Sequence, residues 1–266
     1  MINTLKKFIS IKTIANDKEA NLEGIQLVKD LLEKIGFTIS IEGDSPYNQP
    51  VIIAKYTNLD SSKKVTLYNH YDVEKINKKE KWKTDPFVLT ETDGRYYARG
   101  IADNKGILIC RIFALLEMKE KGLGIPNILW IIQGEEEVAG KTPFDVIPKH
   151  IAEFGSKIYV EETGVNKGEI PVIFYLPITK KQPSFLTELN SALYNGDAIF
   201  DNRSLSKFTK CPFVSNIPED GFYIGFGPND GRCNIHRENE SLDMIKLEKH
   251  KQVFTKFIQW INKTEI

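Results

Sequence analysis

Four clusters of imidazole and carboxylate side chains follow strand-like segments of this sequence. They contain His70 and Asp72, then Asp103, then Glu135-Glu136-Glu137, and finally Glu161-Glu162. In open α/β sheets, side chains at the carboxyl ends of the strands gather in one crevice. One imidazole with several carboxylates suits divalent metals that prefer nitrogen and oxygen ligands. The clusters therefore indicate metal-assisted hydrolysis as the chemistry.

Each cluster also has an ordinary structural explanation. A single His after a strand is more often structural than ligating, but Asp72 makes both interpretations of His70 reasonable, because a metal-bound imidazole donates its other N–H to a carboxylate. Asp103 on its own is a good N-cap for the helix expected to follow it. Adjacent acids such as 135–137 are usually solvated, yet these end a buried strand, where a nearby cation would relieve their repulsion.

The elements expected to position these clusters alternate between helices and strands, which predicts an α/β fold. Apolar residues at helical spacing predict helices over 3–11, Asn21–Ile35, Ile107–Lys121, Pro143–Phe154, Pro183–Tyr194 and Leu242–Ile261. Apolar runs and alternation predict strands over Phe37–Glu42, Val51–Tyr56, Lys64–Tyr68, Asn127–Gln133, Lys157–Val160, Pro171–Leu176, Pro212–Ser215 and Phe222–Phe226. A hairpin turn is expected at Thr92-Asp93-Gly94.

The bulk composition is that of a globular protein without a nucleic-acid or membrane signature. The chain has 266 residues, with 36 basic and 36 acidic side chains, so no overall field favours nucleic acid or an anionic membrane. No apolar stretch reaches the roughly 20 residues of a spanning helix, and the first residues are too polar for a signal peptide. Three distant cysteines without a C-x-x-C pair predict no disulfide framework and fit a reducing cytoplasm.

The combined motifs resemble the two-zinc peptidase and deacylase family. This family includes succinyl-diaminopimelate desuccinylase, acetylornithine deacetylase, aminoacylase, glutamate carboxypeptidase and bacterial dipeptidases. The matching segments are HYDV at 70–73, Trp82 with DPF at 85–87, RGIADNKG at 99–106, GEEE at 134–137, EETG at 161–164 and HRENE at 236–240. The resemblance implies a three-layer α/β/α fold with a central mixed, mostly parallel sheet.

Carried over residue by residue, the resemblance implies a site for two zinc ions, for which cobalt or manganese could substitute. The implied metal ligands are His70, Asp103, Glu137, Glu162 and His236. Within this set, Asp103 resembles the carboxylate that bridges both metals. Asp72 resembles the residue that orients the imidazole of His70, and Glu240 belongs to the H-x-x-N-E signature.

The resemblance also implies a reaction. The two zinc ions would share a hydroxide and polarise the scissile amide carbonyl of a dipeptide or N-acyl amino acid. Glu136 resembles the general base that takes the proton of the water and passes it to the leaving amine. The family further implies a cis peptide bond between Asp103 and Asn104. Ser204 and Ser206, in a polar loop expected at 201–206, are candidate substrate contacts.

The sequence departs from the family in one respect. Family members insert a lid domain, which would fall at about 168–183, but only 21 positions separate Glu162 from Pro183. We therefore expect one catalytic domain over 1–266, without the lid. The family's lid also supplies a His to the site, and we expect no counterpart of it here, because His150 and His250 lie in predicted outer helices. Two interpretations follow: an open-site, monomeric hydrolase of the aminopeptidase type, or a metal-binding scaffold (natural or engineered) with little catalysis.

Overall fold

A mixed sheet runs through the centre of the computed structural model, which describes residues 1–162, 164–179, 182–203, 212 and 214–265. Eight strands form this sheet among the described residues, in the order β1-β2-β6-β3-β7-β11-β9-β10. Their bounds are β1 Thr38–Glu42, β2 Val51–Tyr56, β3 Lys64–His70, β6 Asn127–Gln133, β7 Ile158–Val160, β9 Val172–Leu176, β10 Ile199–Asn202 and β11 Phe222–Gly225. The four strands β6, β3, β7 and β11 run parallel to one another, so the predicted α/β class is confirmed.

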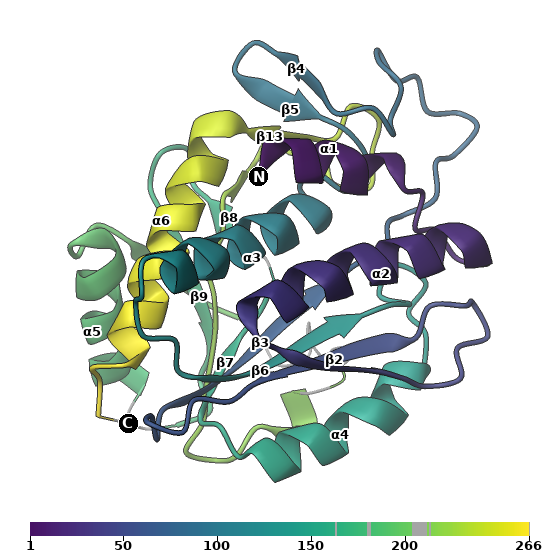
Figure 1. The fold of residues 1–266 in the computed structure, drawn as a ribbon. Coiled ribbons are helices and arrows are strands. Elements are labelled where there is room, and N and C mark those ends of the chain that lie inside the picture. Colours follow the sequence, from purple (N-terminus) through teal and green to yellow (C-terminus); the bar gives the residue numbers. More distant parts are fainter. Residues whose placement is uncertain (163, 180–181, 204–211, 213, 266) are drawn as a thin grey trace.

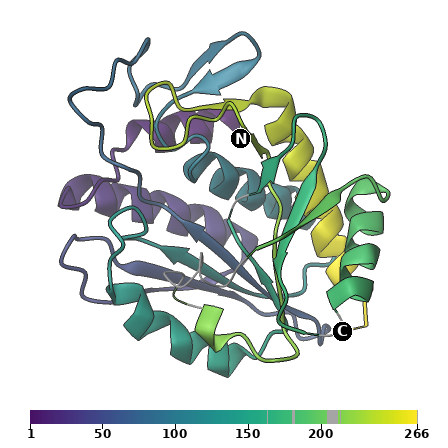
Figure 2. The ribbon, with the colours of Figure 1, turned by 180° about the vertical axis from the view of Figure 1, so that it is seen from behind.

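Helices cover both faces of this sheet. They are α1 Ile2–Ser10, α2 Lys18–Ile35, α3 Lys105–Glu120, α4 Thr142–Phe154, α5 Gln182–Tyr194 and α6 Met244–Ile261. Figures 1 and 2 show α2, α3 and α6 on one face and α4 on the other, which gives the three layers. Among the described residues, no helix is long and apolar enough to cross a membrane.

Alternating side chains of the strands fill two cores, one on each face of the sheet. On β6, Ile128, Trp130 and Ile132 pack toward α2, α3 and α6, whereas Leu129 and Ile131 pack toward α4. All five side chains are fully buried. This double burial explains why β6 is a continuous apolar run, as expected for a strand inside a parallel sheet.

Local signals in the sequence set the ends of the helices. The carboxylate of Asp17 accepts a hydrogen bond from the backbone N–H of Ala20 at the start of α2. Gly36, with a φ of 112°, ends that helix in the left-handed conformation and donates to the carbonyls of Leu32 and Glu33. The predicted hairpin forms from β4 Thr90–Thr92 and β5 Arg95–Tyr97, and β13 Ser241–Asp243 extends it.

The C-terminal third differs from the prediction in three places. The strand predicted at 212–215 is wrong, because Val214–Asn216 form a 3-10 turn (η2). The loop predicted from 201 begins too early, since Asp201 and Asn202 end β10 and pair with β9. A short parallel pair, β8 Val165–Asn166 with β12 Asn229–Asp230, has no counterpart in the prediction, because two-residue strands carry no periodicity.

Candidate functional site

Three neighbouring parallel strands bring three of the predicted clusters to one edge of the sheet. His70 is the last residue of β3 and lies opposite Gln133, the last residue of β6. On the other side of β3, Leu67 pairs with Val160, the last residue of β7. The residues that follow these strands, including 134–137 and 161–162, therefore emerge beside His70.

The fourth cluster reaches the same edge at the start of α3. The peptide bond between Asp103 and Asn104 is cis, as predicted. The amide of Asn69, which lies next to His70 on β3, donates to the side-chain oxygen of Asn104. The amide of Asn229 donates to the carbonyl of Ala102, at 3.1 Å. The loop that carries Asp103 is thus held between β3 and β12.

Asp103 lies between two imidazoles. Its Oδ1 is 2.9 Å from Nε2 of His70, and its Oδ2 is 3.1 Å from Nε2 of His236. Each imidazole faces a second carboxylate: Oε2 of Glu162 lies 3.6 Å from His70, and Oε2 of Glu137 lies 2.7 Å from His236. The structure therefore brings together all five predicted ligands, as two sets that share Asp103.

The side chain of Asp72 faces the opposite nitrogen of His70. Its Oδ1 lies 3.3 Å from Nδ1 of His70, and the backbone carbonyl of Asp72 lies 3.1 Å from the same nitrogen. With the proton on Nδ1, the Nε2 atom of His70 is free to act as a ligand. The other carboxylate oxygen of Asp72 accepts from the backbone N–H of Glu137, at 3.1 Å, so Asp72 also ties the β6 loop to β3.

The charges in this cluster perturb one another strongly. Burial raises the pKa of the Glu137 carboxyl to about 7, and burial raises the pKa of the Glu162 carboxyl well above its usual range. The carboxylates of Asp103 and Glu137, which lie close to its ring, raise the pKa of His236 to about 10. Burial alone would lower the pKa of His70, but Glu162 and the two neighbouring aspartates raise it well above its ordinary value. Such mutual perturbation is typical of functional sites.

Glu136 differs from its neighbour Glu137 because, within the described part of the chain, no imidazole contacts its carboxylate. Burial raises the pKa of Glu136, and the charges of Asp103 and Asp72 raise it further while His70 opposes the shift. Its carboxyl group thus lies near the cluster without belonging to either set of three. A carboxyl group with a raised pKa beside such a cluster is a candidate for proton transfer.

The five residues carry the donor types that divalent cations prefer. The ligand atoms of His70, Asp103 and Glu137 all lie within 4.8 Å of one another. Donor atoms that share a tetrahedral zinc at about 2.0 Å lie roughly 3.3 Å apart, and the contacts within the two sets, from 2.7 to 3.6 Å, bracket that value. Neither oxygen of Glu137 makes a hydrogen bond of good geometry, nor does Oε2 of Glu162. Cations would satisfy these buried oxygens.

The sequence did not predict a buried arginine that lies beneath the site. Arg111, on α3, is fully buried and donates to the carbonyls of Glu161 and Phe226 and to the side-chain oxygen of Asn69. It therefore joins the ends of β3, β7 and β11. One signal was available, because Arg111 is a single charge in the apolar run of α3. The two serines named as substrate contacts, Ser204 and Ser206, lie outside the described residues.

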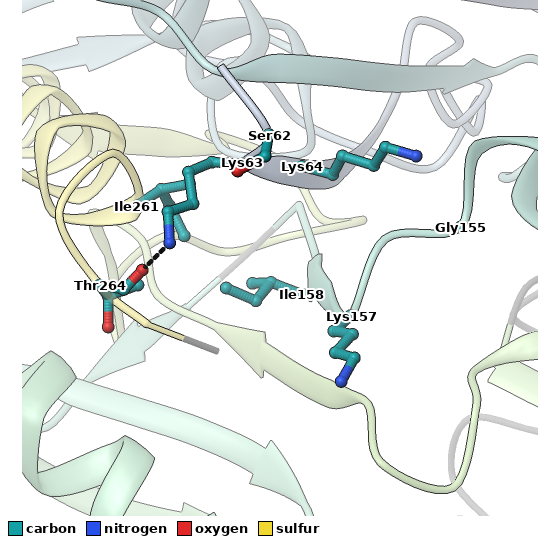
Figure 3. A pocket seen from close by; sticks show the side chains of 8 residues that line it. All are labelled: Ser62, Lys63, Lys64, Gly155, Lys157, Ile158, Ile261 and Thr264. Atoms are coloured by element: carbon teal, nitrogen blue, oxygen red, sulfur yellow. Dashed lines mark hydrogen bonds between the residues drawn. The ribbon is translucent and has the colours of Figure 1, made fainter.

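A hollow at the opposite end of the strands lacks the imidazole and carboxylate groups of this cluster. It has a volume of about 310 Å³ and lies at the first residues of β3 and β7. Figure 3 shows Lys63 reaching across it to the carbonyl of Thr264, which accepts its hydrogen bond at 2.5 Å. Lys157, on its rim, pairs with Asp220 at 2.6 Å. Among the described residues, no carboxylate or imidazole lines this hollow, so it does not compete with the cluster around Asp103 as a candidate active site.

Comparison with known proteins matches one family to most of this chain. The sequence pattern of the family described as "Peptidase family M20/M25/M40" matches residues 66–260, which include all five converging residues. The Cys-Gly metallodipeptidase dug1 of Schizosaccharomyces pombe is 29% identical over 219 residues, which cover 73% of this chain and 45% of that protein. The human Beta-Ala-His dipeptidase is 28% identical over 172 residues, covering 59% and 34% respectively.

The fold is shared with a solved dipeptidase. The structure of Dug1p from Saccharomyces cerevisiae superimposes with a TM-score of 0.83 at 13% identity, and the alignment covers 100% of this chain and 96% of that chain. By sequence, however, this chain spans less than half the length of these two curated relatives. The described residues between Glu162 and α5 form only the short strands β8 and β9.

Proposed function

The chain belongs to the M20/M25/M40 family of peptidases, and on that premise we propose that it hydrolyses a dipeptide with the help of two divalent metal ions. One observation carries the proposal: the two oxygens of Asp103 face two different imidazoles, each with its own second carboxylate. A dipeptide is favoured over an N-acyl amino acid because the two relatives compared above are named as dipeptidases.

We assign each set of three residues to one cation, with zinc as the expected metal and cobalt or manganese as substitutes. His70 and Glu162 would hold the first, His236 and Glu137 the second, and Asp103 both. When bound, the two ions would polarise the scissile carbonyl and lower the pKa of a water molecule. Asp72 would keep the Nε2 atom of His70 available to the first ion.

Glu136 is the proposed general base. Because it belongs to neither set of ligands, its carboxylate would be free to take a proton from the attacking water and deliver it to the leaving amine. The raised pKa of Glu136 lies closer to neutral pH than that of an ordinary carboxyl group. Such a pKa favours both the uptake and the release of a proton.

The proposed catalytic unit is residues 1–266 acting as one domain, without a lid between Glu162 and α5, and as a monomer. An open site of this kind would lack the polar groups that a lid adds around a developing oxyanion. Loss of one such donor costs roughly 10²–10³ in rate. We therefore expect slow turnover with short substrates. The competing proposal is a scaffold that binds metal without hydrolysing anything.

Metal content and turnover, measured together, separate these proposals. The wild type and Glu136→Gln would be stripped of metal, titrated with zinc, and assayed with Cys-Gly, β-Ala-His and N-acetylated amino acids. We expect two zinc ions in both proteins and dipeptide turnover in the wild type. In the variant, turnover should fall by about 10²–10⁴ because only proton transfer is lost. Two zinc ions without wild-type turnover would favour the scaffold, and equal turnover in both proteins would refute the role of Glu136.

A further inference from the structure

Glu240 holds the loop that carries Asp103. Its side chain is fully buried. One carboxylate oxygen accepts from the backbone N–H groups of Ala102 and Asp103, at 2.9 and 3.1 Å. The other accepts from the backbone N–H of Gly100, at 3.0 Å. A single carboxylate thus fixes three amides of the turn from which the Asp103 side chain projects, and Glu240 itself contacts neither imidazole in the described structure.

Arg99 links this carboxylate to the loop at residues 74–84, which we term the rim loop. Its side chain is fully buried, and one guanidinium nitrogen lies 3.0 Å from Oε2 of Glu240. Another lies 3.1 Å from Oε2 of Glu80, in the rim loop. The guanidinium also lies over the ring of Trp82, 5.4 Å from its centroid. Trp82 in turn donates its indole N–H to the same oxygen of Glu80, at 2.7 Å.

The rim loop also binds the segment that follows His236. The backbone N–H of Lys83 donates to the side chain of Asn239, at 2.9 Å, and the backbone N–H of Lys81 donates to the carboxylate of Glu238. In Figures 1 and 2 the blue loop before β4 and the yellow segment before α6 lie side by side in both views. The same loop therefore touches the supports of both Asp103 and His236.

We propose that Arg99, Glu240 and the rim loop form one positioning network that sets the distance between Asp103 and His236. This inference rests on the proposed two-metal function. None of these side chains touches the reacting atoms, so each acts through the residue it holds. The buried pair is decisive, because a planar guanidinium contacts two carboxylates in fixed directions, which a lysine cannot reproduce. Loss of either partner leaves the other charge buried and unpaired.

Variants at different distances from Asp103 test the network. Glu240→Gln removes the ion pair with Arg99. It also replaces one of the two carboxylate oxygens, which accept from three backbone N–H groups, with an NH₂ group that cannot accept. Arg99→Lys keeps the positive charge but loses the planar guanidinium that contacts Glu80 and Glu240 with two different nitrogens. Glu80→Gln alters only the outer end, where the side chain is 14% exposed, so this variant should fold even if a substitution at the buried pair does not. Glu91→Gln, on exposed β4, removes the same charge outside the network and is the control.

Two readouts distinguish positioning from simple stability. Zinc affinity should fall about 10–100-fold in Glu240→Gln and Arg99→Lys, the range found when partners of metal ligands are removed. It should fall less in Glu80→Gln and not at all in Glu91→Gln. In metal-free protein, well below the unfolding temperature, hydrogen exchange should accelerate at the amides of Gly100, Ala102 and Asp103 in Glu240→Gln, while the strands stay protected.

The outcomes also separate this inference from the proposed function. The kcat of the network variants should drop with KM little changed. The proposed metal ligands Asp103 and His236 would move, whereas the surface that binds the substrate would keep its shape. Wild-type zinc affinity and kcat in Arg99→Lys and Glu80→Gln would overturn the network while leaving the two-metal function intact. A wild type that binds no zinc would instead refute the function. Uniformly faster exchange throughout the variants would reduce the role of Glu240 to stability and overturn the inference.

Discussion

At the scale of single residues, the site depends on which atom of each side chain is left free. The contact between Asp72 and Nδ1 of His70 leaves Nε2 available, and the absence of an imidazole partner distinguishes Glu136 from Glu137 in the described structure. Adjacent residues of one type thus acquire different chemistry from different surroundings. The residues of the cluster could be predicted from their types and positions in the sequence. The separate role proposed for each one required the geometry or the family resemblance.

Outside the site, Glu42 makes a pH-dependent contribution to stability. Its carboxylate lies 2.7 Å from the ammonium of Lys149 and 3.0 Å from the imidazole of His150. Burial would raise the pKa of Glu42, but hydrogen bonds from Lys149, Ser40 and His150 lower it from 4.5 to about 2. A depressed folded-state pKa adds stability above the unfolded value, and that stability is lost as the pH falls toward 2.

We therefore predict that Glu42→Gln unfolds at a lower temperature than the wild type near neutral pH. The difference should shrink between pH 4.5 and the acid limit of the folded protein. Thermal unfolding followed by circular dichroism at a series of pH values measures it. Glu23→Gln, at an exposed position of α2, is the control for the loss of one charge. A difference that stays constant down to pH 3 would contradict the assigned partners.

At the scale of elements, the predictable part of the fold is the part with strong local periodicity. The apolar run of β6 was predicted with its exact bounds, and Gly36 marked the end of α2 correctly. The predictions failed at 201–202, which end the short strand β10, and at 214–216, which form a 3-10 turn. Arg99 and Glu240 meet across 141 positions (240 minus 99) of sequence. No local sequence pattern predicts such an ion pair, because its formation depends on how distant elements pack.

The junction between the Asp103 loop and α3 leaves no room for a side chain at Gly106. A Cβ atom there would lie 2.1 Å from the carbonyl oxygen of Ile101, a contact that forces the backbone to move. Gly106→Ala should therefore destabilise the protein by about 1–3 kcal/mol and reduce turnover by displacing Asp103. Urea unfolding and dipeptide assays measure both effects.

Gly124→Ala provides the matched control, since its nearest neighbour would be the amide of Asn262 at 3.6 Å. This variant should unfold at the wild-type urea concentration and retain wild-type turnover. If Gly106→Ala behaved in the same way, the close packing between the loop and α3 would not hold Asp103 in place.

At the scale of the whole molecule, the site is assembled from segments that extend from residue 70 to residue 236. Three of these segments are the ends of the parallel neighbours β6, β3 and β7, and the other two are the loop before α3 and the turn before β13. The α/β class followed from the alternation of elements. The order of the strands did not, because pairing between distant strands has no local signal. The described chain thus brings the five proposed ligands together within less than half the length of the two curated relatives compared above.

Anomalous diffraction from crystals grown with zinc tests this convergence most directly. We predict two peaks in the anomalous difference map, one beside His70 and Glu162 and the other beside His236 and Glu137, with Asp103 in contact with both. A map with no peak within bonding distance of Asp103, from protein shown to contain zinc, would contradict the account.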